Sequence, residues 1–181
     1  MPAPARTTRA DIVDAARTLL ATGGVDAVTM AAVASRVGIR APSLYKHVRD
    51  REEMLVLVTD SAVEDLAERL RGAEGTLPAL AHAYRTFAAE NPEAFALILG
   101  SRASVDRLAD AAAPVLAAVS ALVGDRDALA GARLLTAWMT GFIAMERAGA
   151  FRLGGDVEAA FSWGLDRLQS ALRTPDQPVR A

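Results

Sequence analysis

Cysteine is absent from the chain of 181 residues. Disulfide bonds, thiol nucleophiles and thiolate metal ligands are therefore excluded, and the composition fits a reducing compartment. No stretch approaches the roughly 18 uninterrupted apolar residues that a membrane-spanning helix requires, and the N-terminal segment lacks the apolar core of a secretory signal. These absences predict a cytoplasmic protein that has no membrane partner.

Segments rich in valine, isoleucine, threonine and aromatic residues, which are typical of strands, are nearly missing, and aromatic residues make up only 5% of the chain. Alanine is abundant instead, and it is a strong helix former with little side-chain entropy to lose. The fold class predicted from this composition is all-α.

Motifs of common enzymes and metal proteins are missing as well. The chain has no G-x-G-x-x-G, P-loop or H-E-x-x-H sequence, and His47 and His82 have no neighbours at metal-ligand or catalytic-triad spacing. The adjacent Glu52 and Glu53 are explained by their place at the start of a helix, where acidic side chains favour the helix dipole. We expect no catalytic residue, no metal site and no cofactor, and we expect that the protein is not an enzyme.

Basic side chains are concentrated at the N-terminal end. The formal net charge of the chain is -2, but residues 1–51 contain eight Lys or Arg against four Asp or Glu, so this part carries +4 and the remainder -6. This distribution favours an anionic partner at the N-terminal end, although a solvated charged surface is the alternative.

Apolar residues recur at helical spacing through most of the chain. Gly23 and Gly24 are expected to stop the first helix, and the fixed φ of Pro42 suits the first position of a helix. The predicted helices cover residues 8–20, residues 29–38, a segment from Pro42 that includes Leu44, Tyr45 and Val48, a long segment after Asp50, and residues of about 77–90, 92–101, 104–123, 126–149 and 156–173.

Two of these helices are short and are joined by a turn of about four residues that contains Gly38, which is the pattern of a helix-turn-helix. In that motif the second helix enters the major groove of DNA, and its N-terminal part faces the base edges. Arg6 and Arg9, on a flexible arm, would add phosphate or minor-groove contacts. The alternative is a surface hairpin with exposed charges. The candidates for DNA contact are Arg40 and Ser43, at bases, Thr29, Tyr45 and Lys46, at phosphates, and His47.

Together with the helix before it, this segment resembles the DNA-binding domain of the TetR family of bacterial transcriptional regulators. The likeness extends over residues 12–58 and is carried by "VASRVGI" and by "SLYKHV" followed by "DREEML". Val48 departs from the aromatic residue of most members but still fills an apolar position. The resemblance implies an all-helical protomer with a three-helix DNA-binding head, a linking fourth helix and a regulatory body. It also implies DNA contacts at Thr29, Ser43, Tyr45 and Lys46, and less consistent ones at Arg40 and His47.

The two predicted C-terminal helices have apolar residues that indicate a dimer. The helix at 126–149 is apolar on more than one face, so both sides must be covered. The last helix has an alternating four-three spacing that suits packing against another helix. Packing within the chain is the alternative, whereas the resemblance implies a four-helix dimer interface. The predicted interface residues are Leu135, Val157, Phe161, Gly164 and Leu168.

Aromatic and flexible apolar side chains in the C-terminal part could line an effector pocket, although the same residues could be plain core. This part also resembles a TetR-type regulatory domain that has a Trp-His-Gly signature, with Thr140 in place of the histidine. His82 is expected to face solvent. The predicted effector-binding residues are Tyr84, Phe87, Phe95, Leu99, Trp138, Met139, Phe142 and Met145.

These patterns divide the chain into a helix-turn-helix domain at 1–50, a linking helix and linker at 51–76, an effector-binding and dimerisation domain at 77–174 and a disordered tail at 175–181. The predicted function is a TetR-type repressor that binds a palindromic operator in double-stranded DNA as a homodimer. A small, largely apolar effector would release it. The alternative is a helical small-molecule-binding protein without sequence-specific DNA binding.

Overall fold

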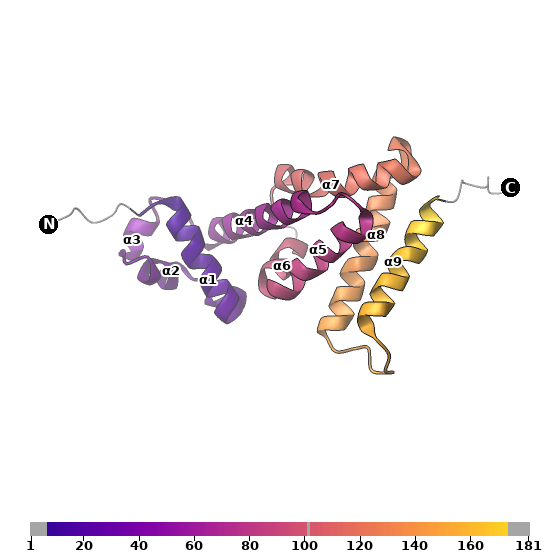
Figure 1. Cartoon of the computed structure of the whole chain (residues 1–181). Helices are drawn as coiled ribbons and strands as arrows, with labels where there is room; N and C mark the ends of the chain where they lie inside the picture. The colour runs from indigo at the N-terminus through magenta and orange to yellow at the C-terminus, as the bar shows by residue number, and fades with distance from the viewer. Residues whose placement is uncertain (1–6, 101, 174–181) are drawn as a thin grey trace, which may run out of the picture. The chain divides into compact units, whose positions relative to one another are not determined.

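The computed structural model describes residues 7–100 and 102–173, which form helices and connecting turns without any strand (Figure 1). The predicted all-α class is therefore confirmed. Arg6, residue 101 and the predicted disordered tail at 175–181 lie outside the described residues. The helices of the described part are α1 (Arg9–Ala27), α2 (Met30–Arg36), α3 (Ala41–Leu44), α4 (Arg51–Gly72), α5 (Leu77–Glu90), α6 (Pro92–Leu99), α7 (Val105–Val123), α8 (Asp125–Arg147) and α9 (Val157–Arg173).

Two helix boundaries differ by more than two residues from the sequence prediction. α1 continues to Ala27, but Gly24 interrupts it with a φ of 68°, a left-handed conformation that glycine adopts without steric cost. α3 is shorter than predicted, because the backbone after Leu44 tightens into turns. There the N–H of Lys46 bonds to the carbonyl of Ser43, and that of His47 to Leu44.

The chain forms two compact units. The first contains residues 1–66 and 90–110, and the second contains residues 67–89 and 111–181. The first unit therefore includes α1 to α3, most of α4, α6 and the start of α7. The second includes α5, most of α7, α8 and α9.

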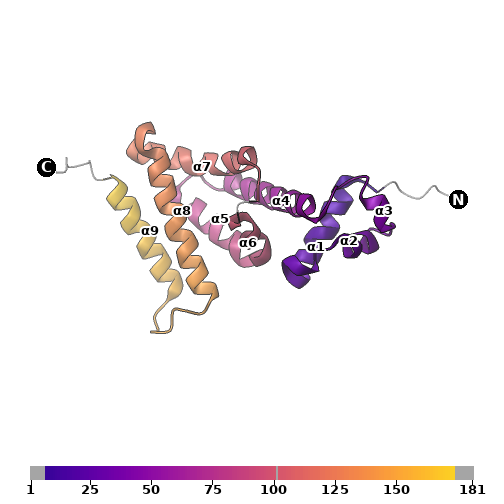
Figure 2. The ribbon, with the colours of Figure 1, turned by 180° about the vertical axis from the view of Figure 1, so that it is seen from behind.

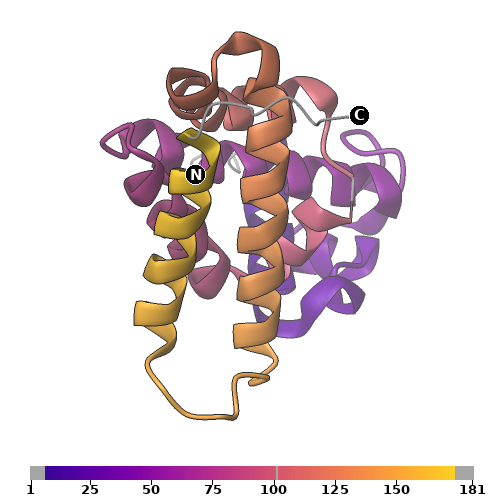
Figure 3. The same ribbon diagram turned by 90° about the vertical axis from the view of Figure 1, so that its right-hand side faces the viewer.

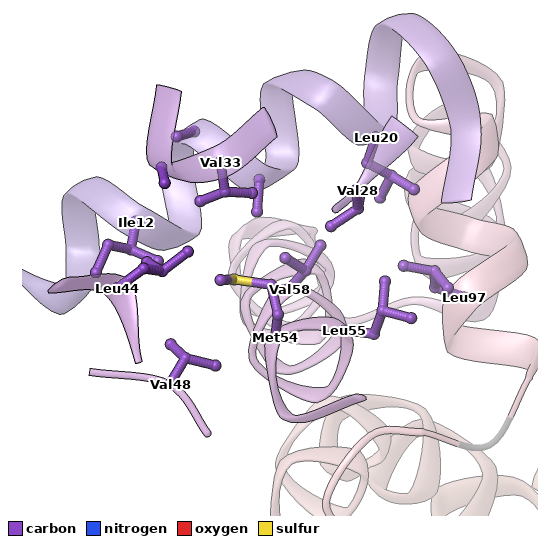
Figure 4. Close-up of a cluster of buried hydrophobic side chains, with 13 residues drawn as sticks. Ile12, Leu20, Val28, Val33, Leu44, Val48, Met54, Leu55, Val58 and Leu97 are labelled. Atoms are coloured by element: carbon purple, nitrogen blue, oxygen red, sulfur yellow. The ribbon is translucent and has the colours of Figure 1, made fainter. Parts of the chain in front are cut away.

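A single apolar cluster forms the core of the first unit (Figure 4). Val33 of α2 and Leu44 of α3 are fully buried in it, together with Leu55 and Val58 of α4. Leu97 brings α6 into the same core. Helices of four and seven residues are not stable alone, so this shared core holds the short helices in place.

In the second unit, α8 and α9 lie side by side and run in opposite directions (Figures 2 and 3). Trp138 of α8 stacks on Phe161 of α9 with ring centroids 5.2 Å apart. A Cβ atom added at Gly164 would lie 2.4 Å from Cζ2 of Trp138, so only glycine fits against the ring at this point. The close packing of this pair depends on that missing side chain.

Candidate nucleic-acid interface and effector region

The predicted turn between α2 and α3 is present. Gly38 has a φ of 73°, and the N–H of Ile39 bonds back to the carbonyl of Ala34 at 3.0 Å, as in a helix that ends at a left-handed glycine. Ala34 is 2% exposed, which agrees with the close approach expected of a small residue. These contacts fix the direction in which α3 leaves α2.

The segment of residues 41–48, which contains α3 and is called the α3 segment below, has an apolar side and a polar side. Leu44 and Val48 are buried, whereas Tyr45, Lys46 and His47 are exposed. Tyr45 keeps 54% of its surface although it belongs to a tightly packed head. The buried Leu44 and Val48 therefore anchor this segment in the core, and the side chains of Tyr45 and Lys46 point toward solvent.

The other three DNA-binding candidates are the N-cap residues of α2 and α3 and one residue within α3. Arg40 is exposed at the N-cap of α3, and Ser43 is half-buried in its only turn. Thr29 is the N-cap of α2, and its Oγ1 accepts a hydrogen bond from the N–H of Ala32 at 3.1 Å. Its hydroxyl hydrogen can still be donated, as a phosphate contact requires.

Four arginines of the basic N-terminal part are engaged within the first unit, namely Arg9, Arg17, Arg49 and Arg51. Arg51 donates to the carbonyls of Val28 at 2.7 Å and Val25 at 2.6 Å, which ties the start of α4 to the connection between α1 and α2. Arg17 of α1 pairs with Asp65 of α4. No local sequence pattern indicates these contacts, because the partners lie 23 to 48 positions apart.

Arg9 does not belong to a free arm, which corrects the sequence prediction. It is the first residue of α1, and its guanidinium lies 3.2 Å from the carboxylate of Glu53. The backbone N–H of Arg49 donates to the same carboxylate at 2.7 Å and holds the pKa of Glu53 below its usual value. Glu53 thus joins the starts of α1 and α4.

The predicted effector-binding residues do not form one set. Phe95 and Leu99 belong to the first unit, and the other six belong to the second. Phe87, Phe95 and Met139 are buried, whereas Leu99 and Met145 are 47% and 49% exposed. None of the eight lines any of the three cavities described for the chain. Their role in effector binding stays a prediction.

Thr140 forms a side-chain hydrogen bond within the chain. Its hydroxyl shares a hydrogen bond of 3.0 Å with the phenol of Tyr84. Tyr84 is 8% exposed, and this burial raises the pKa of its phenol. The pair joins α5 to α8, and each hydroxyl satisfies the other.

A cavity of about 450 Å³ in the second unit lies beside a partly buried arginine, Arg85. Arg85, with 13% of its side chain exposed, donates to both carboxylate oxygens of Glu146 at 2.9 and 2.6 Å and to Glu158 at 2.5 Å. The guanidinium lies 4.7 Å from the ring centroid of Phe161. These hydrogen bonds lower the pKa of Glu146 and raise that of Arg85.

The lining of this cavity differs from the aromatic lining that the sequence predicts. It includes His82, Arg85, Ile143, Glu146, Arg147 and Glu158. His82 is 46% exposed, in agreement with a solvent-facing position, and its Nδ1 also lies 3.6 Å from Glu158. The sequence missed Arg85 and its carboxylates, since they lie 61 and 73 positions apart and share no motif.

Two predicted dimer residues face the interior of their own chain. Leu135 and Phe161 are 1% and 0% exposed, and Gly164 lies against Trp138. The four-three spacing of α9 therefore matches α8 of the same chain, which was the alternative left open by the pattern. Val157 and Leu168 are half-buried. The exposed large apolar residues of α8 and α9 are Leu129, Leu134, Met145 and Trp163.

α8 is long and apolar enough, by length and composition alone, to cross a membrane, and 33% of its most apolar window is buried among the described residues. The core helix of a soluble protein satisfies the same criterion.

An all-helical chain with a helix-turn-helix at its N-terminal end belongs to the class of helix-turn-helix DNA-binding proteins. The family model "Bacterial regulatory proteins, tetR family" matches residues 12–58, and the model "Tetracyclin repressor-like, C-terminal domain" matches residues 77–168. The chain belongs to the TetR family of transcriptional regulators.

Relatives from several bacteria agree with this assignment. The chain is 28% identical, over 183 aligned positions, to the uncharacterized HTH-type transcriptional regulator Rv0681 of Mycobacterium tuberculosis; the match covers 93% of this chain and 83% of that protein. It is 35% identical over 91 positions to the class D tetracycline repressor of Escherichia coli, covering 50% of this chain and 39% of the repressor. The chain thus matches less than half of the tetracycline repressor.

Solved structures extend the likeness to the whole fold. The crystal structure of regulatory protein SCO4313 is 29% identical, with a TM-score of 0.73, and covers 88% of this chain and 94% of its own. A TetR variant from Acinetobacter baumannii in complex with minocycline is 20% identical, with a TM-score of 0.70, and covers 93% and 99%. At that identity the second likeness shows the fold alone.

Proposed function

We propose that this TetR-type regulator is a homodimeric repressor, which binds a palindromic operator in double-stranded DNA and leaves it when a small effector binds. The observation that carries the proposal is the α3 segment, where exposed Tyr45 and Lys46 alternate with buried Leu44 and Val48. Because the buried residues fix this segment before DNA binds, its polar side chains can enter the major groove without a disorder-to-order transition.

Within this proposal the polar residues have separate roles. Arg40 and Ser43 contact base edges, since they lie at the N-terminal part of α3. Tyr45, Lys46, His47 and the hydroxyl of Thr29 contact phosphates and fix the register of the head on DNA. The head corresponds to residues 1–50, the linking segment to 51–76 and the regulatory body to 77–174.

A dimer gives the short reading helix enough affinity. Helix-turn-helix dimers engage two half-sites about one helical turn apart, which makes the operator palindromic. The exposed Leu134, Met145 and Trp163 of α8 and α9 provide an apolar surface that a second copy would cover. Covering this surface also accounts for the apolar character of α8 in a cytoplasmic protein.

The effector site is proposed at the cavity beside Arg85. Its volume of about 450 Å³ lies in the range of small-molecule pockets, which is roughly 300–1,000 Å³. Because Arg85, Glu146 and Glu158 join α5, α8 and α9, an effector that competes for one of these charges changes how the three helices pack. We therefore propose a polar effector rather than the largely apolar one predicted from the sequence. No catalytic step is part of this function.

Genomic DNA selection with the full-length protein at physiological salt tests the proposal. We expect enrichment of a palindromic sequence. The double variant Tyr45→Ala, Lys46→Ala should bind this sequence more weakly and with a flatter salt dependence, by about 0.9 in log-log slope per lost phosphate contact and subunit. Arg133→Ala removes an exposed charge from α8 and serves as the control. Enrichment of no sequence at all would reject sequence-specific binding.

A further inference from the structure

A second cavity, of about 350 Å³, lies within the first unit among α1, α4 and the start of α6. Leu20 and Ala21 of α1 and Val58 and Ala62 of α4 line its apolar side. The volume lies within the range of small-molecule pockets, roughly 300–1,000 Å³. No family feature or sequence motif described above accounts for this cavity.

The charged side chains at the cavity differ in whether they already have partners. Arg17 is neutralised by Asp65 and also donates to the hydroxyl of Ser61 at 2.9 Å. Glu93, at the start of α6, has no hydrogen bond or ion pair with any other described residue. Its Oε2 lies 3.5 Å from the position of a Cβ added at Gly24. The cavity thus combines an apolar wall with one carboxylate that has no side-chain partner among the described residues.

We infer that this cavity is a ligand site for a small organic cation with an apolar body. The cationic group pairs with the Glu93 carboxylate, because a partly buried carboxylate without a partner gains a charge-assisted hydrogen bond there. The apolar body lies against the apolar side of the cavity, where Ala21 is exposed and Leu20 and Val58 form the wall behind it. An anionic ligand of the same shape is repelled by Glu93, and Glu90 adds a second acidic side chain to the lining.

The site is coupled to the DNA-reading helices through the core. Leu20 and Val58 line the cavity and also belong to the cluster that buries Val33 and Leu44 (Figure 4). α1 packs directly on α6 in the same unit. A ligand held between these helices therefore stabilises one arrangement of the head, and its affinity and the DNA affinity change by the same factor.

Calorimetric titration of the full-length protein with three probes of equal shape tests the ligand class. The probes are 4-phenylbutylammonium, 4-phenylbutanol and 4-phenylbutyrate, which share a phenyl ring on a four-carbon chain and differ in the terminal group and its charge. We expect the ammonium to bind about tenfold more tightly than the alcohol and the carboxylate to bind least. Failure of the ammonium to bind at millimolar concentration, or equal binding of ammonium and alcohol, would overturn the assignment.

Two variants locate the binding. Glu93→Gln should reduce the affinity for the ammonium to that for the alcohol, whereas Glu68→Gln, which removes an exposed carboxylate of α4, should leave it unchanged. Ala21→Leu fills the cavity from an exposed helix position and should weaken both probes equally, while Ala96→Leu on the exposed side of α6 should not. An ammonium preference that persists in Glu93→Gln overturns the proposal, even if Ala21→Leu fails to fold. The titrations contain no DNA, so their outcome is independent of the repressor proposal.

Discussion

Replacing Trp163 by alanine should dissociate the proposed dimer while leaving the protomer folded. Trp163 is 64% exposed on α9, and the guanidinium carbon of Arg167 lies 5.6 Å from its ring centroid. An exposed tryptophan of this kind contributes little to the stability of the protomer. Covered by a second subunit, it would be a principal contact of the interface.

The magnitude follows from the exposed fraction. A tryptophan side chain buries up to about 250 Å², so 64% exposure leaves about 160 Å² for a partner to cover. At about 25 cal/mol per Å², complete covering contributes at most about 4 kcal/mol per protomer. If half of that surface is covered, the two copies together lose about 4 kcal/mol, and the dimer Kd rises on the order of 1,000-fold.

Sedimentation velocity over a concentration series measures this Kd directly. We expect wild-type dimer at micromolar concentration and Trp163→Ala monomer under the same conditions. Val105→Ala is the matched control, since Val105 is 80% exposed on α7 in the first unit and lies outside the α8 and α9 surface. Phe161→Ala provides the contrast, because Phe161 is fully buried within its own chain and its loss should lower the free energy of unfolding by about 3–5 kcal/mol.

A dimer Kd that stays unchanged in Trp163→Ala would refute the reasoning. So would an equal loss of dimer in Val105→Ala, since the effect would then reflect general apolar exposure. A wild-type protein that stays monomeric at every accessible concentration would remove the dimer from the proposed function altogether.

Three further changes test individual contacts. Gly164→Ala gains about 1 kcal/mol of helix propensity but places a methyl group 2.4 Å from Trp138, so overpacking of about 1–3 kcal/mol should leave a net loss in urea denaturation. Arg51→Met removes two hydrogen bonds to the connection between α1 and α2, and should lower operator affinity by about tenfold while helix content by circular dichroism is retained. Glu146→Gln should lower the free energy of unfolding by about 1–2 kcal/mol at neutral pH, with solvent screening of Arg85 and Glu146 taken into account.

The pH dependence of the last variant follows from the lowered pKa of Glu146. A carboxyl group whose pKa is lower in the folded state stabilises the fold above its unfolded pKa of 4.5, and this contribution disappears as the pH falls through the folded value. Wild-type stability should therefore decrease below about pH 4.5 more steeply than that of Glu146→Gln. Parallel pH profiles of the two proteins would contradict a role for the Arg85–Glu146 ion pair. A Gly164→Ala variant more stable than wild type would contradict the close packing on Trp138. An unchanged operator affinity of Arg51→Met would contradict a role for its two hydrogen bonds in DNA binding.

The helices of the first unit were predictable because their signals are local. Thr29 caps α2, and Gly38 takes the left-handed conformation that ends it, both through contacts within a few residues. The alternation of buried Leu44 and exposed Tyr45 also follows from helical periodicity. Local patterns of this kind allowed the polar side of the reading segment to be proposed without a structure.

The partners of charged and apolar faces were not predictable in the same way. Arg9 and Arg51 both contribute to the positive charge of residues 1–51. In the structure, however, Arg9 pairs with Glu53, and Arg51 donates hydrogen bonds to backbone carbonyls. Phe161 has the spacing of a helix-packing residue, and the spacing does not tell whether the facing helix belongs to the same chain. Each of these questions depends on residues that lie far away along the sequence.

The sequence by itself determined the all-helical class, the helix-turn-helix and the polar residues on its reading segment, because helix formation, capping and turns depend on neighbours within about four positions. Only the tertiary structure decided that Phe161 packs against Trp138 of its own α8 and that Trp163 remains exposed. It also decided that Arg85 and its two carboxylates meet at one cavity. Glu146 and Glu158 lie 61 and 73 positions from Arg85 along the chain, and helical periodicity specifies the face of a helix but not the helix that packs against it.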